Sequence, residues 1–381
     1  MKSFSLQTSS QELAAEIQQW KDKNLQVILM FSSTELLKDG RLCQTLKQAL
    51  PETEIIGCST AGEIGNRVDD DSISLLGFHF DSARIKCVQV EINSPDTSFE
   101  AGRALAEELN ADDLVGIFTL APGLNVNGSK FVNGLKHNLP STTTISGGLA
   151  GNGLDFKETV TVYNTDISPT HAVGFGLYGD SVTMKNGSGG GWRPFGPLRR
   201  VTKVENNILY ELDGKSALGL YKEYLGEKAA DLPSSGLLYP FAIMDNQTDQ
   251  GDGLIRTILD IDEKAGSLIL AGDIENGKKV CLMHANTDEL VEGAENAAET
   301  AKEEATDSDE NNAVICVSCV GRKIVMGEDT EDELDAVKDV FGNAPIAGFY
   351  SYGEISHFQD TGKAELHNQT MTVTRISEHT K

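Results

Sequence analysis

The amino-acid sequence predicts an α/β protein made of two related halves, in which mixed β-sheets are flanked by helices. One observation is a repeated turn: GCSTAGEI at 57–64 returns as GFYSYGEI at 348–355, and a shorter echo lies at 145–151. Another is that each turn closes a strand–helix–strand pattern. Repeated supersecondary units determine architecture, and alternating strands and helices are typical of α/β folds.

Three strand–helix–strand units follow from hydrophobic periodicity. A helix at 11–23 precedes them, with Leu13, Ile17 and Trp20 on one face. The predicted strand, helix and strand lie at 27–31, 41–50 and 54–57 in the first unit, at 114–119, 128–139 and 143–147 in the second, and at 313–318, 331–341 and 346–351 in the third.

The segments between the units indicate further strands, several of which alternate apolar and polar residues as half-buried antiparallel strands do. We therefore expect mixed sheets. A glycine cluster at 186–192 is typical of a loop or hinge, and a helix is expected at about 216–225. The sequence predicts a division near residue 212, into halves at 1–212 and 213–381. The additional strands are expected at 72–80, 84–92, 158–163, 172–178, 254–261 and 267–271.

The composition is that of a soluble globular protein, with 381 residues, a hydrophobic share of 39% and a charged share of 24%. A net charge of −26 disfavours nucleic acid and anionic membrane surfaces as partners. The chain has neither an apolar signal region at its start nor an apolar stretch of membrane-spanning length, and its six cysteines are scattered. We therefore expect a cytoplasmic protein with no membrane insertion.

Three segments of the sequence partly match catalytic or metal-binding motifs, but each lacks a required feature. The run 213–216 resembles the end of a phosphate-binding loop, but Leu209 stands where that loop needs a glycine. The turn around Ser59 resembles a nucleophile elbow, but its fifth position is Ala61. Cys316 and Cys319 lie on a predicted strand, where side chains three apart point to opposite faces. The sequence therefore predicts no catalysis by the chain itself.

Five stretches in order along the chain resemble the FIST family of sensory domains, with an N-terminal and a C-terminal FIST half. They are the runs 57–64, 147–151, 191–202, 352–355 and 366–372. The resemblance implies a ligand-binding input module for bacterial signalling. This chain looks like the stand-alone members, one group of which resembles nitric-oxide-sensing haemoproteins that regulate a partner histidine kinase and cyclic-di-GMP signalling. The resemblance also implies a second ligand class, amino acids and similar small metabolites.

The candidate ligand site joins the repeated turns across the two halves. Glu63 and Glu354 would line one cleft and suit an ammonium, while Arg322 could pair with a ligand carboxylate. Alternatively, both glutamates cap local turns and Arg322 neutralises one of them. A third interpretation takes the two carboxylates as the acid and base of a hydrolase. The candidate ligand-binding residues are Cys58, Ser59, Gly62, Glu63, Gly147, Gly148, Arg322, Tyr352, Gly353, Glu354, His367 and Asn368.

A haem site makes different demands, namely an apolar pocket, an axial histidine and cations for the propionates. His357 stands where the family pattern has proline, so it is either an axial ligand to the haem iron or a neutral loop change. His284 ends an apolar strand and is the other candidate. Arg193 and Arg199 lie in a basic island and would either hold propionates or pair with the acidic surface.

Overall fold

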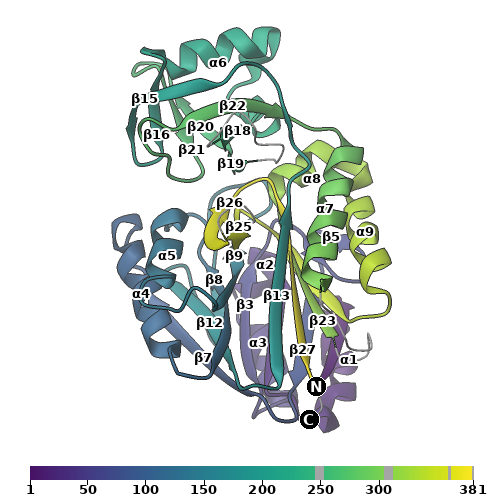
Figure 1. Cartoon of the computed structure of the whole chain (residues 1–381). Helices are drawn as coiled ribbons and strands as arrows, with labels where there is room; N and C mark the ends of the chain where they lie inside the picture. The colour runs from purple at the N-terminus through teal and green to yellow at the C-terminus, as the bar shows by residue number, and fades with distance from the viewer. Residues whose placement is uncertain (245–252, 304–311, 359–361, 380–381) are drawn as a thin grey trace.

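The computed structural model describes residues 1–244, 253–303, 312–358 and 362–379. Within these ranges the strands form three mixed sheets of six strands each and a fourth sheet of nine strands. The three six-stranded sheets make up the main body (Figure 1). The nine-stranded sheet and helix α6 (Ala217–Leu225) sit on one end of this body (Figure 1). The expected α/β class, with mixed sheets flanked by helices, is confirmed.

The three six-stranded sheets are built alike, with a parallel pair at the centre, two antiparallel strands on one side and a hairpin on the other. Sheet 1 contains, in order, β1 (Lys2–Thr8), β6 (Ile73–His79), β2 (Val27–Ser32), β3 (Glu54–Ser59), β10 (Thr161–Tyr163) and β11 (Asp166–Ser168). Sheet 2 contains β7 (Arg84–Glu91), β12 (His171–Tyr178), β8 (Leu114–Ala121), β9 (Thr144–Leu149), β25 (Gly353–Phe358) and β26 (Lys363–His367). Sheet 3 contains β13 (Val182–Gly189), β27 (Met371–Glu378), β23 (Asn312–Cys319), β24 (Ile346–Ser351), β4 (Glu63–Ile64) and β5 (Val68–Asp69).

Each unit gives its hairpin to another unit's sheet. The hairpin β4–β5 follows β3 of sheet 1 but pairs with β24 of sheet 3. The hairpin β10–β11 follows β9 of sheet 2 but pairs with β3 of sheet 1, and β25–β26 follows β24 of sheet 3 but pairs with β9 of sheet 2. The exchange closes a three-membered cycle, so the body consists of three related units rather than two independent halves.

One glycine in each unit lets the two parallel strands lie against each other. Gly57, Gly147 and Gly348 stand opposite the middle of β2, β8 and β23, respectively. A Cβ atom at these positions would lie 2.2, 1.7 and 1.8 Å from a backbone carbonyl oxygen of the neighbouring strand. No side chain fits at such distances, so these glycines are required by packing, and they fix which residues of the three units correspond.

The three sheets enclose one central apolar core. Phe31, Phe118, Phe175 and Phe349 come from all three sheets, and Phe31 stacks on Phe349 with ring centroids 4.9 Å apart. Helices cover the outer faces. Because both faces are buried, the central strands are continuously apolar. The helices are α1 (Leu13–Glu16), η1 (Ile17–Lys23) and α3 (Arg41–Ala49) on sheet 1, α4 (Ser98–Leu109) and α5 (Gly128–Leu135) on sheet 2, and α7 (Thr287–Lys302) and α9 (Glu331–Phe341) on sheet 3.

The fourth sheet, called the inserted sheet below, lies in the chain between β13 and α7. It has a core of its own around α6, where Tyr221 packs against Phe241. The predicted division at 212/213 falls between two paired strands of this sheet and stays a prediction. Its strands are β14 (Arg193–Pro194), β15 (Arg199–Glu205), β16 (Ile208–Leu212), β17 (Lys215–Ser216), β18 (Phe241–Met244), β19 (Leu254–Arg256), β20 (Ile258–Asp262), β21 (Ser267–Leu270) and β22 (Lys279–His284).

Several short helices complete the described chain: α2 (Thr34–Leu37), α8 (Val320–Met326), η2 (Pro95–Thr97), η3 (Gly226–Asp231), η4 (Ser234–Leu238) and η6 (Gly327–Thr330). In the described ranges, every helix is too short or too polar to span a bilayer.

Candidate functional site

The three repeated turns meet at one end of the body, where backbone hydrogen bonds join them in a ring. Each turn donates one N–H to a second turn and accepts one from the third. The three bonds run from Ala61 to the carbonyl of Tyr350 (2.8 Å), from Tyr352 to Leu149 (3.1 Å) and from Gly151 to Ser59 (2.9 Å). Loops that are up to about three hundred residues apart in the sequence are therefore in direct contact.

The glutamates of two turns have matching surroundings. The hydroxyl of Thr60 donates a hydrogen bond to Glu63, and the hydroxyl of Ser351 donates one to Glu354 at 2.6 Å. Each carboxyl also accepts a hydrogen bond from the backbone just before the strand that follows its hairpin. The N–H of Ser72 donates to Glu63 at 3.0 Å, and the N–H of Thr370 donates to Glu354 at 3.2 Å. Both carboxyl groups tie a turn to the strand beside it.

Neither glutamate is available to a ligand, because both side chains are completely buried and their carboxyl oxygens already accept hydrogen bonds from the protein itself. Burial raises the pKa of Glu63 to about 7 and that of Glu354 to about 8, with the hydrogen bonds to each carboxyl opposing the shift. The hypothesis that they line a common cleft is therefore corrected: each carboxyl is enclosed by its own turn. The same burial removes the support for an acid–base pair on a shared substrate.

Arg322 is also occupied within the protein. Its guanidinium donates to Glu333 at 3.0 and 2.8 Å and to the carbonyls of Gly190 and Leu290 at 2.6 and 2.7 Å, and both charged side chains are fully buried. It lies on α8 and joins the segment after β13, α7 and α9, so the structure does not place it against a ligand.

The other candidate residues divide between the interior and two cavities. Gly62 lines a cavity of about 430 Å³ beside Lys323. His367 is buried with Nε2 3.1 Å from the carbonyl of Ser356, and burial lowers its pKa to about 4. Tyr352 and Asn368 line a different cavity. The remaining candidates, Cys58, Ser59, Gly147, Gly148 and Gly353, are buried in the strands and turns.

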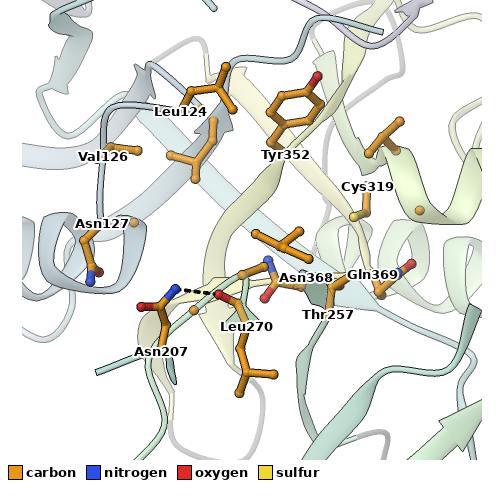
Figure 2. A pocket seen from close by; sticks show the side chains of 18 of the residues that line it. Leu124, Val126, Asn127, Asn207, Thr257, Leu270, Cys319, Tyr352, Asn368 and Gln369 are labelled. Carbon is orange, nitrogen blue, oxygen red and sulfur yellow. Dashed lines mark hydrogen bonds between the residues drawn. The ribbon is translucent and has the colours of Figure 1, made fainter. Parts of the chain in front are cut away.

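This last cavity, called the Asn368 cavity below, lies between the end of the body and the inserted sheet and has a volume of about 360 Å³. The body contributes the ends of β9 and β23 and the segments that follow β8 and β26, and the inserted sheet contributes residues around Thr257 and Leu270. Figure 2 shows Asn368, Gln369 and Thr257 in the same part of the view, with Tyr352 and Leu124 above them.

Four side-chain polar atoms of the Asn368 cavity are buried without a hydrogen-bond partner in the described part of the chain. They are both amide atoms of Asn368, Oε1 of Gln369 and Oγ1 of Thr257. Asn368 is 1% exposed. A buried polar atom left unpaired costs about 1–3 kcal/mol, so a cluster of four at the wall of a cavity points to a partner that the protein itself does not supply.

The backbone of the cavity lining is strained at two residues. Gln369 and Phe156 both line the cavity, and both have positive φ, at 61° and 51°. Residues with side chains adopt this left-handed region at a cost, and such residues cluster at functional sites. Two hydrogen bonds to the segment that carries the inserted sheet hold Gln369 there: its Nε2 donates to the carbonyl of Leu237 in η4 at 2.8 Å, and its own carbonyl accepts from Nε1 of Trp192 at 2.8 Å.

The opposite wall is aromatic and apolar. The ring of Tyr352 stacks on Phe156 with centroids 4.5 Å apart and planes inclined by 16°. Leu149 and Val320 extend the apolar surface beside it. Among the described lining residues the one ionisable carboxylate is Asp273, whose Oδ1 accepts from Asn127 at 2.9 Å, and no arginine, lysine or histidine is present. The cavity is therefore built for an uncharged, partly flat ligand.

The residues proposed for haem do not form a common site. His357 lines another cavity, and its Nε2 accepts the backbone N–H of Ile145 at 3.2 Å, which occupies the lone pair that iron would need. Burial lowers the pKa of His357. His284 packs edge-on against Phe195 in a third place. The residues present therefore do not fit a haem.

The two arginines of the haem hypothesis are likewise held elsewhere. Arg193 pairs with Glu289 and Glu292 of α7, at 3.4 and 3.1 Å. Arg199 pairs with Asp213 at 3.2 Å in the inserted sheet. Both arginines therefore pair with acidic side chains of the protein, which is the second of the two roles expected for the basic island.

Sequence reasoning missed Gln369 and Thr257. Gln369 lies within the run 366–372, which resembles the family. That run led to its neighbour Asn368 as a candidate, but nothing in the run distinguished Gln369. Thr257 belongs to the inserted sheet, and no local pattern indicates that this sheet folds back over the repeated turns.

Comparison with known families agrees with four of the five stretches, since the run 366–372 lies beyond the matched residues. The FIST N domain matches residues 26–215, and the FIST C domain matches residues 217–357. The chain belongs to the FIST family. FIST domains are sensory ligand-binding domains of signalling proteins, so the coarse prediction of a sensory FIST protein is confirmed. The haem, nitric-oxide and kinase details stay predictions.

Curated relatives of this FIST protein are distant and longer than the aligned region. An uncharacterised protein of Methanocaldococcus jannaschii is 24% identical over 345 residues, which is 82% of this chain and 64% of the relative. An uncharacterised protein of Mycobacterium tuberculosis is 27% identical over 245 residues, which is 63% of this chain and 62% of the relative. The chain therefore spans less than two thirds of the length of these relatives.

A solved structure of similar extent is that of a cyanuric acid hydrolase from A. caulinodans. It covers 100% of this chain and 99% of its own, with a TM-score of 0.41 and 9% sequence identity. The prediction that this FIST protein has no catalysis of its own is corrected by this match to an enzyme. The likeness is too low to transfer an activity.

Proposed function

We propose that this FIST protein senses a small uncharged molecule that carries an amide or urea group and binds in the Asn368 cavity. The observation that supports the proposal most strongly is the pair of unpartnered amide atoms on Asn368. A carboxamide side chain presents one donor and one acceptor side by side. Its complement is a ligand edge on which an N–H and a C=O are adjacent.

The other unpaired atoms restrict which hydrogen-bonding groups the ligand must carry. Oε1 of Gln369 accepts only, so it requires a second N–H on the ligand, whereas the hydroxyl of Thr257 can donate or accept. The stacked rings of Tyr352 and Phe156 favour a flat ligand body. A small planar amide with two N–H groups meets all three requirements.

The alternative of a free amino acid is less well supported. A zwitterion brings a carboxylate and an ammonium into the cavity, and burying either without an opposite charge costs several kcal/mol. The lining offers no cation, and Asp273 is engaged by Asn127. The haem version lacks a histidine with a free ring nitrogen at a shared pocket, as described above.

The output of the sensor is proposed from family membership. Because FIST domains act in signalling proteins, the liganded state would be recognised by a signalling partner, for which a histidine kinase is the leading candidate. The inserted sheet and its connecting segments supply part of the lining of the Asn368 cavity, so ligand binding would strengthen their contact with the body. A change at this contact is the signal that we expect a partner to detect.

A thermal-shift screen tests the ligand class. Matched sets of one scaffold as amide, acid and amine, for example nicotinamide, nicotinate and 3-picolylamine, separate charge from shape. A ligand that binds only the folded state raises Tm, and the shift grows with the logarithm of its concentration once that exceeds Kd. We expect shifts from uncharged amides alone. Shifts confined to the acids and amines would contradict the proposal, as would a Soret band in the purified protein that His357→Ala removes.

A further inference from the structure

A second cavity of about 610 Å³ lies between the body and the inserted sheet, on the other side of the segment that carries Thr257. It is called the Arg256 cavity below. Arg256, Lys136 and His357 line it together with apolar side chains such as Ile243 and Leu254. Arg256 and Thr257 are successive residues at the end of β19, and in extended chain successive side chains point to opposite sides. The two cavities are therefore separate sites.

Arg256 is a buried cation that has no counter-ion among the described residues. It is 3% exposed. Its Nε donates to the carbonyl of Asp273 at 2.9 Å, and its Nη1 donates to the carbonyls of Ile255 and Leu366, both at 3.0 Å. Within the described residues it forms no ion pair, and Nη2 donates no hydrogen bond.

Gly272 allows the guanidinium to occupy this place. A Cβ atom at this position would lie 2.9 Å from Nε of Arg256. The chain thus leaves room for the guanidinium beside the cavity, although carbonyl oxygens neutralise only part of its charge.

The neighbouring carboxylates are already engaged. Glu365 accepts from Lys136 at 2.8 Å, and Asp273 accepts from Asn127 at 2.9 Å. Burial lowers the pKa of Arg256 to about 10, in spite of an opposing influence from Glu365 and Asp273. An isolated buried charge costs several kcal/mol unless a partner of opposite sign is present. Arg322 shows the contrast, since it is equally buried but has Glu333.

The wall of the Arg256 cavity is basic in a strongly acidic protein. Counted over the described lining residues, its formal charge is +1, from four basic residues against three acidic ones, whereas the whole chain is −26. The basic lining residues are Lys136, Arg256, Lys278 and Lys363, and the acidic ones are Asp273, Glu275 and Glu365.

We propose that the Arg256 cavity binds a small organic carboxylate, with the carboxylate on the guanidinium of Arg256. A guanidinium matches the planar shape of a carboxylate and binds it with charge-assisted hydrogen bonds. Apolar side chains at Leu139, Ile145 and Leu254 form a surface for the organic part of the ligand. A phosphate dianion is disfavoured, because three carboxylates lie in the same wall. This site does not depend on the function proposed for the Asn368 cavity.

Isothermal titration with hexanoate tests the site, with methyl hexanoate and inorganic phosphate as the controls. We expect saturable binding of hexanoate, and at least tenfold weaker binding of the ester and of phosphate. Binding of phosphate as tight as that of hexanoate would overturn the carboxylate assignment. Equal binding of the ester would show that the charge is not recognised, and absence of hexanoate binding would also overturn the proposal.

Two variants locate the bound carboxylate. Arg256→Gln is expected to weaken hexanoate binding at least tenfold, whereas Arg199→Gln, which removes an arginine of the same sheet paired with Asp213, is expected to leave it unchanged. Leu139→Trp narrows the cavity without touching Arg256 and should also weaken binding, so the site can be tested even if Arg256→Gln does not fold. Binding retained in Leu139→Trp, or lost equally in Arg199→Gln, would place the ligand elsewhere.

Discussion

At the scale of single residues, this protein contains buried polar groups of two opposite kinds. Glu63 and Glu354 are fully paired inside their turns and hold strands together. Asn368 and Arg256 are equally buried but keep atoms unpaired at the walls of two cavities. The first kind contributes to folding, and the second weakens the empty protein in a way that a bound ligand would reverse.

Glu354 should make stability depend on pH. Its folded pKa of about 8 lies above the ordinary value of 4.5, so the folded state holds the proton more tightly. Its contribution is fully present below pH 4.5 and is lost as pH rises through 8, with a slope of up to about 1.4 kcal/mol per pH unit. Glu354→Gln should match the wild type at pH 5 and exceed its stability at pH 9 in urea unfolding. For an exposed control, Glu12→Gln, the difference in stability from the wild type should be the same at pH 5 and pH 9.

Asn368→Leu should stabilise the protein in the absence of ligand. The substitution removes two unpaired polar atoms from a buried place while keeping the volume similar, and each such atom costs about 1–3 kcal/mol. Asn127→Leu is the matched control, because Asn127 lines the same cavity but caps α5 and bonds to Asp273. That control should lose about 1 kcal/mol. A lower Tm for Asn368→Leu would show that its amide has a partner inside the protein.

At the scale of elements, the sequence predicted the repeated units well. The helices expected at 41–50 and 331–341 are observed at Arg41–Ala49 and Glu331–Phe341, because their apolar spacing is regular. The helix expected at 128–139 ends at Leu135, and helices α4 and α7 were not predicted. The pairing of hairpins with other units could not be predicted, since periodicity shows which face of a strand is buried but not its neighbour.

The glycines between the parallel strands should be intolerant of any side chain. In Gly348→Ala the new Cβ would lie 1.8 Å from the carbonyl oxygen of Cys316, so the strands must separate. We expect a loss of about 3 kcal/mol or more in urea unfolding, at the upper end of single-residue effects. Gly219→Ala in α6 meets only an ordinary contact at 3.4 Å and should gain up to about 1 kcal/mol. Equal effects of the two changes would refute the close-packing argument.

At the scale of the whole molecule, the three-unit cycle places distant turns in contact and the inserted sheet covers them (Figure 1). The sequence indicated that the turns converge, and the backbone ring between them bears this out. Of the candidate ligand-binding residues, Asn368 and Tyr352 line the Asn368 cavity, whereas Thr257 and Arg256 were not among the candidates. Those two residues act only because a separate sheet folds against the body, and no local signal in the sequence encodes that contact.

The cycle also predicts that the chain cannot be cut into halves that fold alone. A cut at 212/213 separates β13 from its partner β27, β4 from β24, and β9 from β25. Fragments 1–212 and 213–381 should each lack a cooperative thermal transition by circular dichroism, and should regain one when co-expressed. A cooperative transition in either isolated fragment would show that the exchanged hairpins are dispensable.

The central claim is that Asn368 recognises an uncharged amide ligand. Calorimetric titration of the best amide from the thermal-shift screen into wild type, Asn368→Leu and Arg256→Gln tests it most directly. The account predicts that Asn368→Leu weakens binding at least tenfold, or about 1.4 kcal/mol, while Arg256→Gln changes it little. Unchanged affinity in Asn368→Leu would contradict the account.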